Sequence, residues 1–375
     1  MADDVRVGLV GPGGWAEYFH APIVAAHDGA VLAAVCGRNR ERAEALAAAH
    51  SVDRVYTDVQ EMIDEAHLDA VIVATPEDAH HPAVMAALAA GLHVLCEKPM
   101  AFSAAQSGQM LESANRAGVK HMIQFTNRGL PHFRYVKRLL DDGYIGQPYH
   151  GYFYWPTGWS PAAEAEPYYW AWDAQRSKGS LNELGAHMID LARWYFGEVV
   201  RVSASLQTFV DRMGVDGEPM ETANDSAFVL LDFANGAHAV VHVGTPNIVG
   251  PGLQHTGQTV ILSGADGTLE TRGDPWTHPL PPVSEIVGFR RGADTAERLV
   301  VAEADSDGAD RGDALAVFPG EAFAAFWTQS IGPRLFIDAI LDDRPIEPSF
   351  HDGHQVQRIV EAAMESHQTG TSQNL

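Results

Sequence analysis

Cysteine is scarce in this chain of 375 residues, where Cys36 and Cys96 are the only two. Each ends an apolar run that is typical of a buried strand, and neither stands in a CxxC motif. A disulfide framework or a redox pair is therefore not expected, and we predict two inert core thiols in a reducing compartment.

Long hydrophobic runs are also missing. No stretch reaches the roughly 18 to 20 uninterrupted apolar residues that span a bilayer. The chain enters a strand by Val5, without the basic segment and apolar stretch of a signal peptide. We expect a cytoplasmic protein without a membrane partner.

Basic residues are few, because 25 Lys and Arg stand against 49 Asp and Glu, which gives a formal net charge of -24. Such a surface repels phosphate backbones and anionic lipid, so nucleic acid is not an expected partner. A local basic pocket for a phosphorylated cofactor remains compatible with it. The 18 histidines show no HExxH or comparable ligand spacing, so no metal site is expected.

The length exceeds what one hydrophobic core usually organises, and the pattern changes near residue 125. We therefore predict an α/β protein with a Rossmann domain at residues 1–125, a doubly wound parallel sheet. Its expected strands are Val5–Val10, Val31–Cys36, Ala70–Ala74, His93–Cys96 and Lys120–Gln124. Its expected crossover helices are Ala16–His27, Arg40–His50, Val59–Glu65, Pro82–Ala90 and Ala104–Ala117.

For residues 126–375 we predict an α+β domain with a large, mostly antiparallel open sheet. We expect this domain to bind the substrate and to mediate oligomerisation. Its expected strands are Tyr149–Trp155, Val199–Val210, Ser226–Phe233, Ala237–Val243 and Thr259–Ser263, and its expected helices are His132–Asp142, Leu181–Phe196, Phe323–Leu341 and Gly353–His367. Asn235-Gly236 indicates a hairpin, because both residues tolerate positive φ. Residues 274–312, rich in Pro, Gly and Asp, are expected to form irregular excursions.

A glycine-rich segment directly follows the first strand and opens a helix. Gly11, Gly13, Gly14, Trp15 and Ala16 fit the pattern GxGxxG/A. The first glycine permits a tight turn, the second lets the backbone approach a pyrophosphate, and the third small residue lets the helix pack on the strand. The alternative is a purely structural turn. We expect a dinucleotide site, since the helix N-terminus would receive the anion.

The end of the second strand bears on the choice between NAD and NADP. An NAD site usually has an acidic residue there for the ribose hydroxyls, whereas this chain has Cys36, Gly37, Arg38 and Asn39. Arg38 could pair with a 2′-phosphate, or it could be a solvated residue at a helix start. The sequence favours NADP over NAD as cofactor.

Two further segments carry a family resemblance. One comprises Thr75, Pro76 and His80, followed by Glu97-Lys98-Pro99 at the end of a strand; the other is Glu183 to Asp190, with His187 inside it. Together they resemble the glucose-fructose oxidoreductase and inositol dehydrogenase (Gfo/Idh/MocA) family, over essentially the whole chain. The Glu-Lys-Pro motif is the most specific element.

The resemblance implies an NAD(P)-dependent oxidoreductase that moves hydride between nicotinamide and a hydroxyl of a sugar, inositol or related polyol. Lys98 and His187 would face the nicotinamide and the substrate, with Pro99 shaping the turn, often through a cis bond. Such chemistry needs a base and a cation, which suits histidine and lysine. The glycine segment, the end of the second strand and the resemblance together predict the cofactor contacts, which are Gly11, Gly13, Gly14, Trp15, Arg38, Thr75, Pro76, His80, Glu97 and Lys98. The resemblance also implies a homodimer or homotetramer paired through the C-terminal sheet.

Three of these residues keep a second interpretation. His80 could instead be a satisfied histidine that caps a helix, and Asp190 could be a surface acid or a packing contact. The family has Asp where this chain has Glu183. Glu183 lies on the same helix face as His187, but Ser180-Leu181-Asn182-Glu183 also reads as a capping box. Glu183 is therefore either catalytic or a helix cap.

An aromatic segment follows residue 149. Its members are Tyr149, Tyr152, Phe153, Tyr154, Trp155, Trp159, Tyr168, Tyr169, Trp170 and Trp172. Aromatic faces stack on the C–H faces of sugar rings, so Trp155 and Trp159 are candidate substrate residues; core or subunit packing is the alternative. Two other functions stay open: a redox-neutral, NAD-dependent glycosidase or lyase, and a non-catalytic binding protein.

Overall fold

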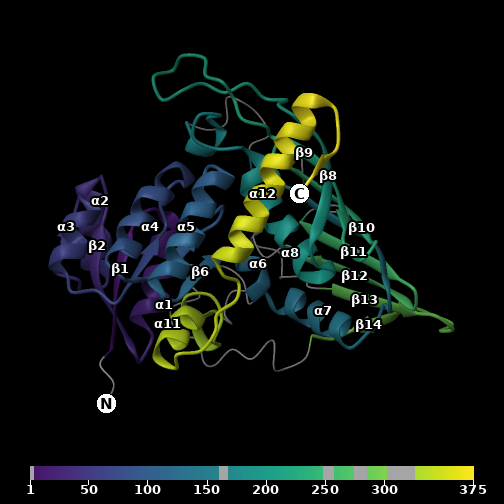
Figure 1. Ribbon diagram of the computed structural model, residues 1–375, viewed down its shortest axis with the longest axis horizontal. Coiled ribbons are helices and arrows are strands. Elements are labelled where there is room, and N and C mark those ends of the chain that lie inside the picture. Colours follow the sequence, from purple (N-terminus) through teal and green to yellow (C-terminus); the bar gives the residue numbers. More distant parts are fainter. Residues whose placement is uncertain (1–3, 160–167, 248–256, 274–284, 302–325) are drawn as a thin grey trace. The chain divides into compact units, whose positions relative to one another are not determined.

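The structure is a computed structural model that describes residues 4–159, 168–247, 257–273, 285–301 and 326–375 (Figure 1). These residues divide into two compact units. Unit 1 contains the described residues up to Thr126 together with residues 326–357, and unit 2 contains the others. None of the helices in these described ranges is long and apolar enough to cross a membrane.

Unit 1 is built on a parallel sheet of six strands. They are β1 (Val5–Val10), β2 (Ala30–Cys36), β3 (Val55–Tyr56), β4 (Ala70–Val73), β5 (His93–Glu97) and β6 (His121–Gln124). Their order is β3-β2-β1-β4-β5-β6, which is the Rossmann order. The predicted fold is confirmed, although the two residues of β3 were too short for a pattern to reveal.

Helices cover the sheet of unit 1 because its strands are apolar on both faces, as the four buried residues of β4 show. The connections are α1 (Ala21–Ala25), α2 (Arg40–Ala49), α3 (Val59–Glu65), α4 (His80–Ala89) and α5 (Ala104–Ala117). Side chains fix where three of them begin: Asn39 accepts from the N–H of Arg42, Asp58 from that of Glu61, and Ser103 from that of Gln106.

A late helix completes unit 1. Helix α11 (Pro333–Leu341) places Phe336 and Ile337 in the core formed by β1, β2 and β4. His27 on the segment after α1 bonds to Asp338 at 3.0 Å. We predicted these residues in the second domain, because a hydrophobic pattern shows that a helix is amphipathic but not which sheet it covers.

Unit 2 contains a sheet of nine strands in the order β14-β13-β12-β11-β7-β10-β9-β8-β15. The strands are β7 (Pro148–Pro156), β8 (Val199–Gln207), β9 (Ser226–Phe233), β10 (His238–Gly244), β11 (Gln258–Gly264), β12 (Gly267–Gly273), β13 (Glu285–Arg290), β14 (Glu297–Leu299) and β15 (Gln373–Asn374). Among the described strands of this second sheet, only the pair β7 and β10 is parallel. The predicted antiparallel sheet is confirmed.

Two details of the second sheet differ from the prediction. Strands β13 and β14 lie inside residues 274–312, where irregular excursions were expected, so the described part of that stretch extends the sheet. The hairpin at Asn235-Gly236 forms between β9 and β10, but only Gly236 takes a positive φ, at 87°. Pro, Gly and Asp are frequent in the sequence of residues 274–312, and they obscured the short alternating runs of β13 and β14.

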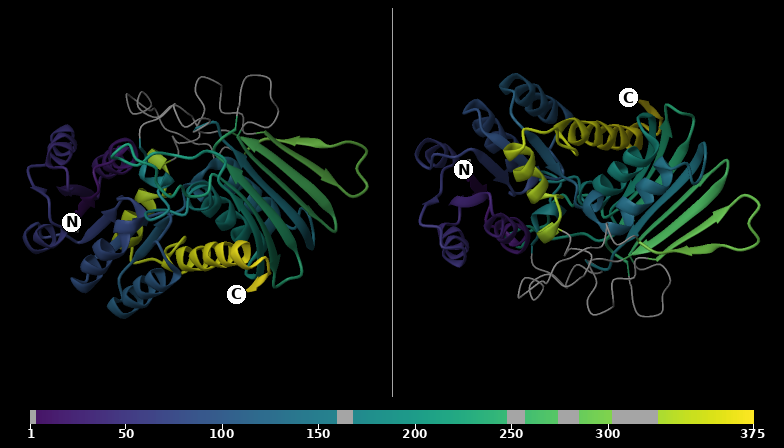
Figure 2. Two further views of the ribbon diagram at one scale, coloured as in Figure 1. Left: turned by 90° about the horizontal axis from the view of Figure 1, so that it is seen from above. Right: turned by 90° about the horizontal axis from the view of Figure 1, so that it is seen from below.

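Helices lie on one face of this sheet. Helix α8 (Ala186–Phe196) packs against β7 and β10, and α7 (Pro131–Asp141) packs against α8 and β12 (Figure 2). The opposite face keeps large side chains exposed, with Phe228 at 48% and Leu230 at 58%. Ser366, near the end of α12 (Phe350–Thr369), accepts from the N–H of Ala204 on β8.

Candidate active site

The glycine turn follows β1 in unit 1. Gly11 has φ of 96°, and a Cβ on it would lie 2.7 Å from the backbone of Ala74 and Thr75. No side chain fits there, so β4 can approach the turn closely. A Cβ on Gly13, by contrast, would meet no atom within 4 Å. The space beside the second glycine is therefore not filled by the described part of the chain.

These features fit a dinucleotide. The Thr75 hydroxyl is buried and finds no partner among the described residues. The backbone of Thr75 lies beside Gly11. Trp15 stacks on Phe19 with ring centroids 4.7 Å apart, and the first helix contains a π-turn, η1 (Ala16–His20). Such turns occur frequently at functional sites. A Cβ on Gly14 would meet only the Tyr18 ring, at 3.5 Å.

The end of β2 carries no acidic residue. A Cβ on Gly37 would lie 2.3 Å from the Pro12 ring, so glycine is required there by packing. Arg38 is exposed, and it makes no hydrogen bond or ion pair within the part of the chain that the structure describes. Burial, then the charges of Asp58 and Glu61, raise the pKa of the Cys36 thiol to about 11. The carboxylates of Asp58 and Glu61 therefore lie near the end of β2, as does the guanidinium of Arg38.

Lys98 lies in the turn that ends β5. Its peptide bond to Pro99 is cis, as the family resemblance implied. Glu97 is buried and bonds on one side to His20, Nε2 to Oε1 at 2.8 Å. Its other oxygen accepts the backbone N–H of Lys98 at 3.1 Å.

His80 opens α4 and is 1% exposed. Its Nδ1 lies 2.9 Å from the Pro99 carbonyl oxygen, and its Nε2 lies 2.7 Å from that of Thr75. Burial lowers its pKa, against which its bonds to backbone carbonyls act. Both ring nitrogens contact backbone, so His80 holds the Thr75-Pro76 turn to the Lys98-Pro99 turn. No cap hydrogen bond is made by a side chain at this helix start.

In unit 2, Glu183 and His187 lie on two consecutive helical segments. Glu183 belongs to a second π-turn, η5 (Leu181–Gly185), and His187 lies in the first turn of α8. His187 is 4% exposed, with its ring 5.9 Å from that of Trp155. Glu183 is partly exposed and accepts from the Tyr169 hydroxyl at 3.3 Å.

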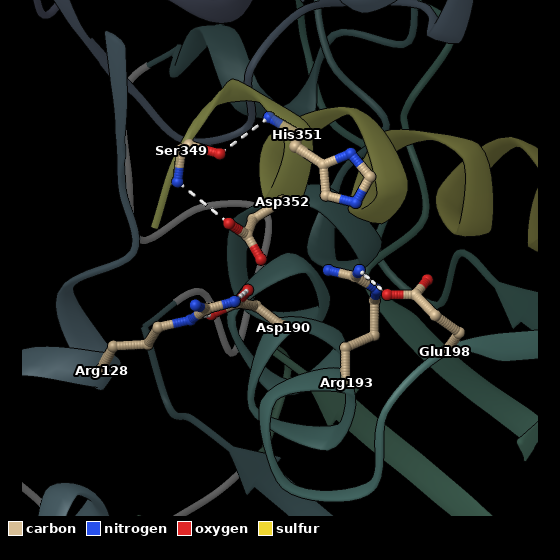
Figure 3. A network of polar contacts seen from close by, with 7 residues as sticks. All are labelled: Arg128, Asp190, Arg193, Glu198, Ser349, His351 and Asp352. Carbon is tan, nitrogen blue, oxygen red and sulfur yellow. Dashed lines mark hydrogen bonds and ion pairs between the residues drawn. The ribbon is translucent and has the colours of Figure 1, made fainter. Parts of the chain in front are cut away.

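The capping box considered for Glu183 does not form. Ser180 makes no side-chain cap hydrogen bond, and its backbone N–H donates to the Asn224 carbonyl at 2.7 Å. A reciprocal box forms instead at the start of α12 (Figure 3). There Ser349 Oγ accepts the N–H of His351 at 3.2 Å, and Asp352 accepts the N–H of Ser349 at 2.9 Å.

Asp190 is a packing residue. Its carboxylate is fully buried and is bound by both arms of the Arg128 guanidinium, at 2.8 and 2.6 Å (Figure 3). Arg128 also lies over the Trp194 ring, 5.5 Å from its centroid. Because a buried carboxylate needs such a partner, Asp190 is not the exposed surface acid that the sequence allowed.

A cavity of about 430 Å³ opens in unit 2, which is the size of a small-molecule site. Its lining residues are Trp159, Tyr169, Ala171, Trp172, Gly179, Ser180, Glu183, Asn224 and Thr245. Trp159 is 44% exposed and rests edge-on against Trp155, whose ring lies 5.9 Å away and is 2% exposed. Of the two predicted tryptophans, Trp159 therefore lines the cavity and Trp155 supports it from the core.

Several residues of these sites were not found from the sequence. Asn224 and Thr245 lie on the segments before β9 and after β10, and no motif marks them. His20 and Arg128 likewise show their importance only through their buried partners, Glu97 and Asp190. Within the described residues, no group of three or more His, Cys, Asp or Glu could hold a metal ion.

The Rossmann order and the glycine turn define a dinucleotide-binding fold, to which the second unit adds a cavity of small-molecule size. Residues 5–125 match the family described as "Oxidoreductase family, NAD-binding Rossmann fold". Residues 133–270 match its "GFO/IDH/MocA C-terminal domain". The chain belongs to the GFO/IDH/MocA family of NAD-binding oxidoreductases, whose members include sugar and inositol dehydrogenases.

Similar proteins include D-apiose dehydrogenase of Paraburkholderia graminis, which is 31% identical over 66% of this chain and 62% of its own length. Inositol 2-dehydrogenase of Rhizobium meliloti is 31% identical over 63% of this chain and 68% of its own length. Among solved structures, a levoglucosan dehydrogenase in complex with NADH and levoglucosan has a TM-score of 0.85 at 22% identity, covering 99% of both chains. That last likeness concerns the fold.

Proposed function

We propose that the protein is an NAD(P)-dependent dehydrogenase that oxidises a hydroxyl of a neutral sugar, inositol or related polyol. The observation that carries this proposal is the cavity of unit 2. Aromatic rings from Trp159, Tyr169 and Trp172 line it, and Glu183 is the only acidic or basic side chain in its described lining. Aromatic faces suit sugar C–H faces, and a lone carboxylate disfavours anionic ligands.

The named relatives support the same class of substrate. Apiose, inositol and levoglucosan are all uncharged and carry several hydroxyl groups. In the proposed reaction His187 takes the hydroxyl proton and the Lys98 ammonium stabilises the developing alkoxide. Glu183 works with His187 as the second acid or base of the proton transfer. The bound nicotinamide supplies the hydride acceptor.

The cofactor would be held by the glycine turn and by the two loops beside it. The backbone at Gly13 would approach the pyrophosphate, with the Thr75 hydroxyl within the same site. We infer a preference for NADP, because Arg38 is exposed and has no other partner among the described residues. The charges of Asp58 and Glu61 near Cys36 act against a 2′-phosphate, so the preference depends on Arg38.

The exposed face of the second sheet supports assembly of copies of this chain. Phe228 on β9 and His242 on β10 stack at 3.7 Å, and Tyr154 on β7 lies 4.9 Å from His242. Burial lowers the pKa of His242, which favours its neutral form. We propose that copies of this chain form a homodimer or homotetramer through this face. We also propose that the protein is cytoplasmic.

The test is a panel of polyols measured by nicotinamide absorbance with each cofactor. Matched pairs such as inositol and an inositol monophosphate separate the ring from its charge. We expect neutral members to reduce the cofactor with kcat/KM about a hundredfold above their phosphates, since placing like charges together costs several kcal/mol. Elimination or hydrolysis of a glycoside without net cofactor reduction would instead establish a redox-neutral enzyme, and binding without turnover a non-catalytic protein.

A further inference from the structure

A buried acid and histidine adjoin the Lys98 turn, and the proposed chemistry does not use either of them. The His20 side chain is fully buried, and that of Glu97 is 10% exposed. His20 Nε2 and Glu97 Oε1 are 2.8 Å apart, although the residues are 77 positions apart in the chain. Burying the Glu97 carboxylate without a partner would cost free energy, and the contact with His20 reduces this cost.

Both oxygens of Glu97 are engaged, and each contact points to a different part of unit 1. Oε1 meets His20, the last residue of η1, which follows the glycine turn. Oε2 accepts the backbone N–H of Lys98. The carboxylate therefore links the first helix of the dinucleotide site to the backbone that presents Lys98.

The position of the His20 ring is fixed from its other side. Phe19 meets it edge-on at 5.3 Å, and Phe19 itself packs on Phe326 at 5.0 Å. His20 Nδ1 is buried without a partner among the described residues, so the contact with Glu97 is the ring's only described hydrogen bond. A ring held in this way can fix Glu97, whereas a residue that lacked a donor at the Nε2 position could not.

We propose that His20 is a positioning residue for Lys98: through Glu97 it fixes the backbone N–H of Lys98 and so the direction in which the lysine leaves its turn. His80 anchors the following residue by its bond to the Pro99 carbonyl. The inference rests on the proposed function for the role of Lys98 in the reaction, and on the contacts of unit 1 alone for its geometry.

Two substitutions separate positioning from simple packing. His20→Gln keeps an N–H donor near the place of Nε2, whereas His20→Asn keeps a similar amide but cannot reach Glu97. We expect His20→Asn to lower kcat about tenfold or more, since misplacing a reacting group by about 1 Å has effects of this order or larger. His20→Gln should keep most of the kcat. The dissociation constant for the cofactor should change less than about threefold in both.

A second readout does not depend on turnover. The chain contains four lysines, Lys98, Lys120, Lys137 and Lys178. Reductive methylation with ¹³C therefore gives few side-chain signals in an NMR spectrum, and Lys98→Met assigns the one from Lys98. This signal should shift in His20→Asn and stay in place in His20→Gln, while the other three lysines serve as internal controls.

The outcomes are distinguishable. A parent-like kcat together with an unmoved Lys98 signal in His20→Asn would overturn the positioning role while leaving the proposed function intact. Normal turnover in Lys98→Met would overturn the role of Lys98 in the reaction, and the Lys98 signal would then decide the positioning role alone. Should His20→Asn melt far below the parent, Glu97→Asp replaces it, because a shorter carboxylate cannot bridge both groups and should give the same loss of kcat.

Discussion

At the scale of single residues, the two glycines that differ most in their surroundings carry different requirements. Gly11 has a positive φ and touches the backbone of Ala74 and Thr75, so its requirement belongs to the fold. A Cβ on Gly13 would meet no atom of the described chain within 4 Å, so we attribute the need for glycine there to the proposed cofactor. The motif in the sequence marks both positions but cannot separate these two reasons.

Alanine substitutions separate them. Gly11→Ala should lower the free energy of unfolding by about 1 to 3 kcal/mol, because a side chain there is strained. Gly13→Ala should leave the melting temperature unchanged and weaken cofactor binding about tenfold, because its methyl group would occupy space meant for the pyrophosphate. Thermal melts and fluorescence titration with cofactor measure both. Parent-like cofactor affinity in Gly13→Ala would place the pyrophosphate elsewhere.

The proposed preference for NADP also depends on a single residue, Arg38. Arg38→Ala should weaken NADP binding about tenfold or more and leave NAD binding nearly constant, since only the 2′-phosphate needs the guanidinium. Arg40, an exposed arginine in the first turn of α2 that pairs with Glu44, is the matched control. Equal losses for both cofactors in Arg38→Ala, or a clear NAD preference in the parent, would contradict the proposal.

At the scale of elements, π-turns distinguish the two helices that carry candidate residues. One ends at His20 after the glycine turn, and the other contains Glu183 just before His187. The sequence predicted helices in both places but not the wider turn, because one extra residue in a turn leaves the apolar pattern nearly unchanged. It also offered a capping box at Ser180, whereas Gly179, with φ of 60°, and Asn224 organise that helix start.

Glu183 and Ser349 provide a paired test of these element ends. Glu183→Gln should lower turnover by about a hundredfold and shift the pH profile, the scale of a lost acid or base, with the melting temperature preserved. Ser349→Ala removes a cap that does form and should cost about 1 kcal/mol of stability with normal kinetics. Steady-state kinetics and denaturant unfolding read the two effects. Unchanged turnover in Glu183→Gln would remove it from the reaction.

At the scale of the whole molecule, the two sheets and most helices were predictable from the sequence, whereas the elements that complete them were not. Buried apolar strands alternating with helices predicted the parallel sheet, and alternation with a hairpin predicted the antiparallel one. Helix α11 completing the core of unit 1, and β13 and β14 extending the other sheet, depend on contacts distant in sequence. The same holds for the candidate sites. Motifs predicted Lys98, Glu183 and His187, whereas residues distant in sequence that pack near them, such as His20, could be identified only from the structure.

The exposed band on the second sheet gives a prediction for the assembly. Leu230→Asp places a charge in the centre of the proposed interface, so the mass measured by light scattering should fall toward that of one chain. Ser205→Asp, on the neighbouring strand β8 near the edge of the sheet, is the milder control. A monomeric parent, or an unchanged assembly in Leu230→Asp, would show that copies do not pair through this face.

The most direct test of the account is the turnover of a neutral polyol by Lys98→Met and His187→Ala beside the parent. We propose that both residues act on the hydroxyl that loses its proton while the carbon bearing it loses hydride, so each variant should lose about a hundredfold or more in kcat. Cofactor affinity and melting temperature should stay close to the parent's. A kcat in Lys98→Met or in His187→Ala that equals the kcat of an active parent would contradict the proposed chemistry.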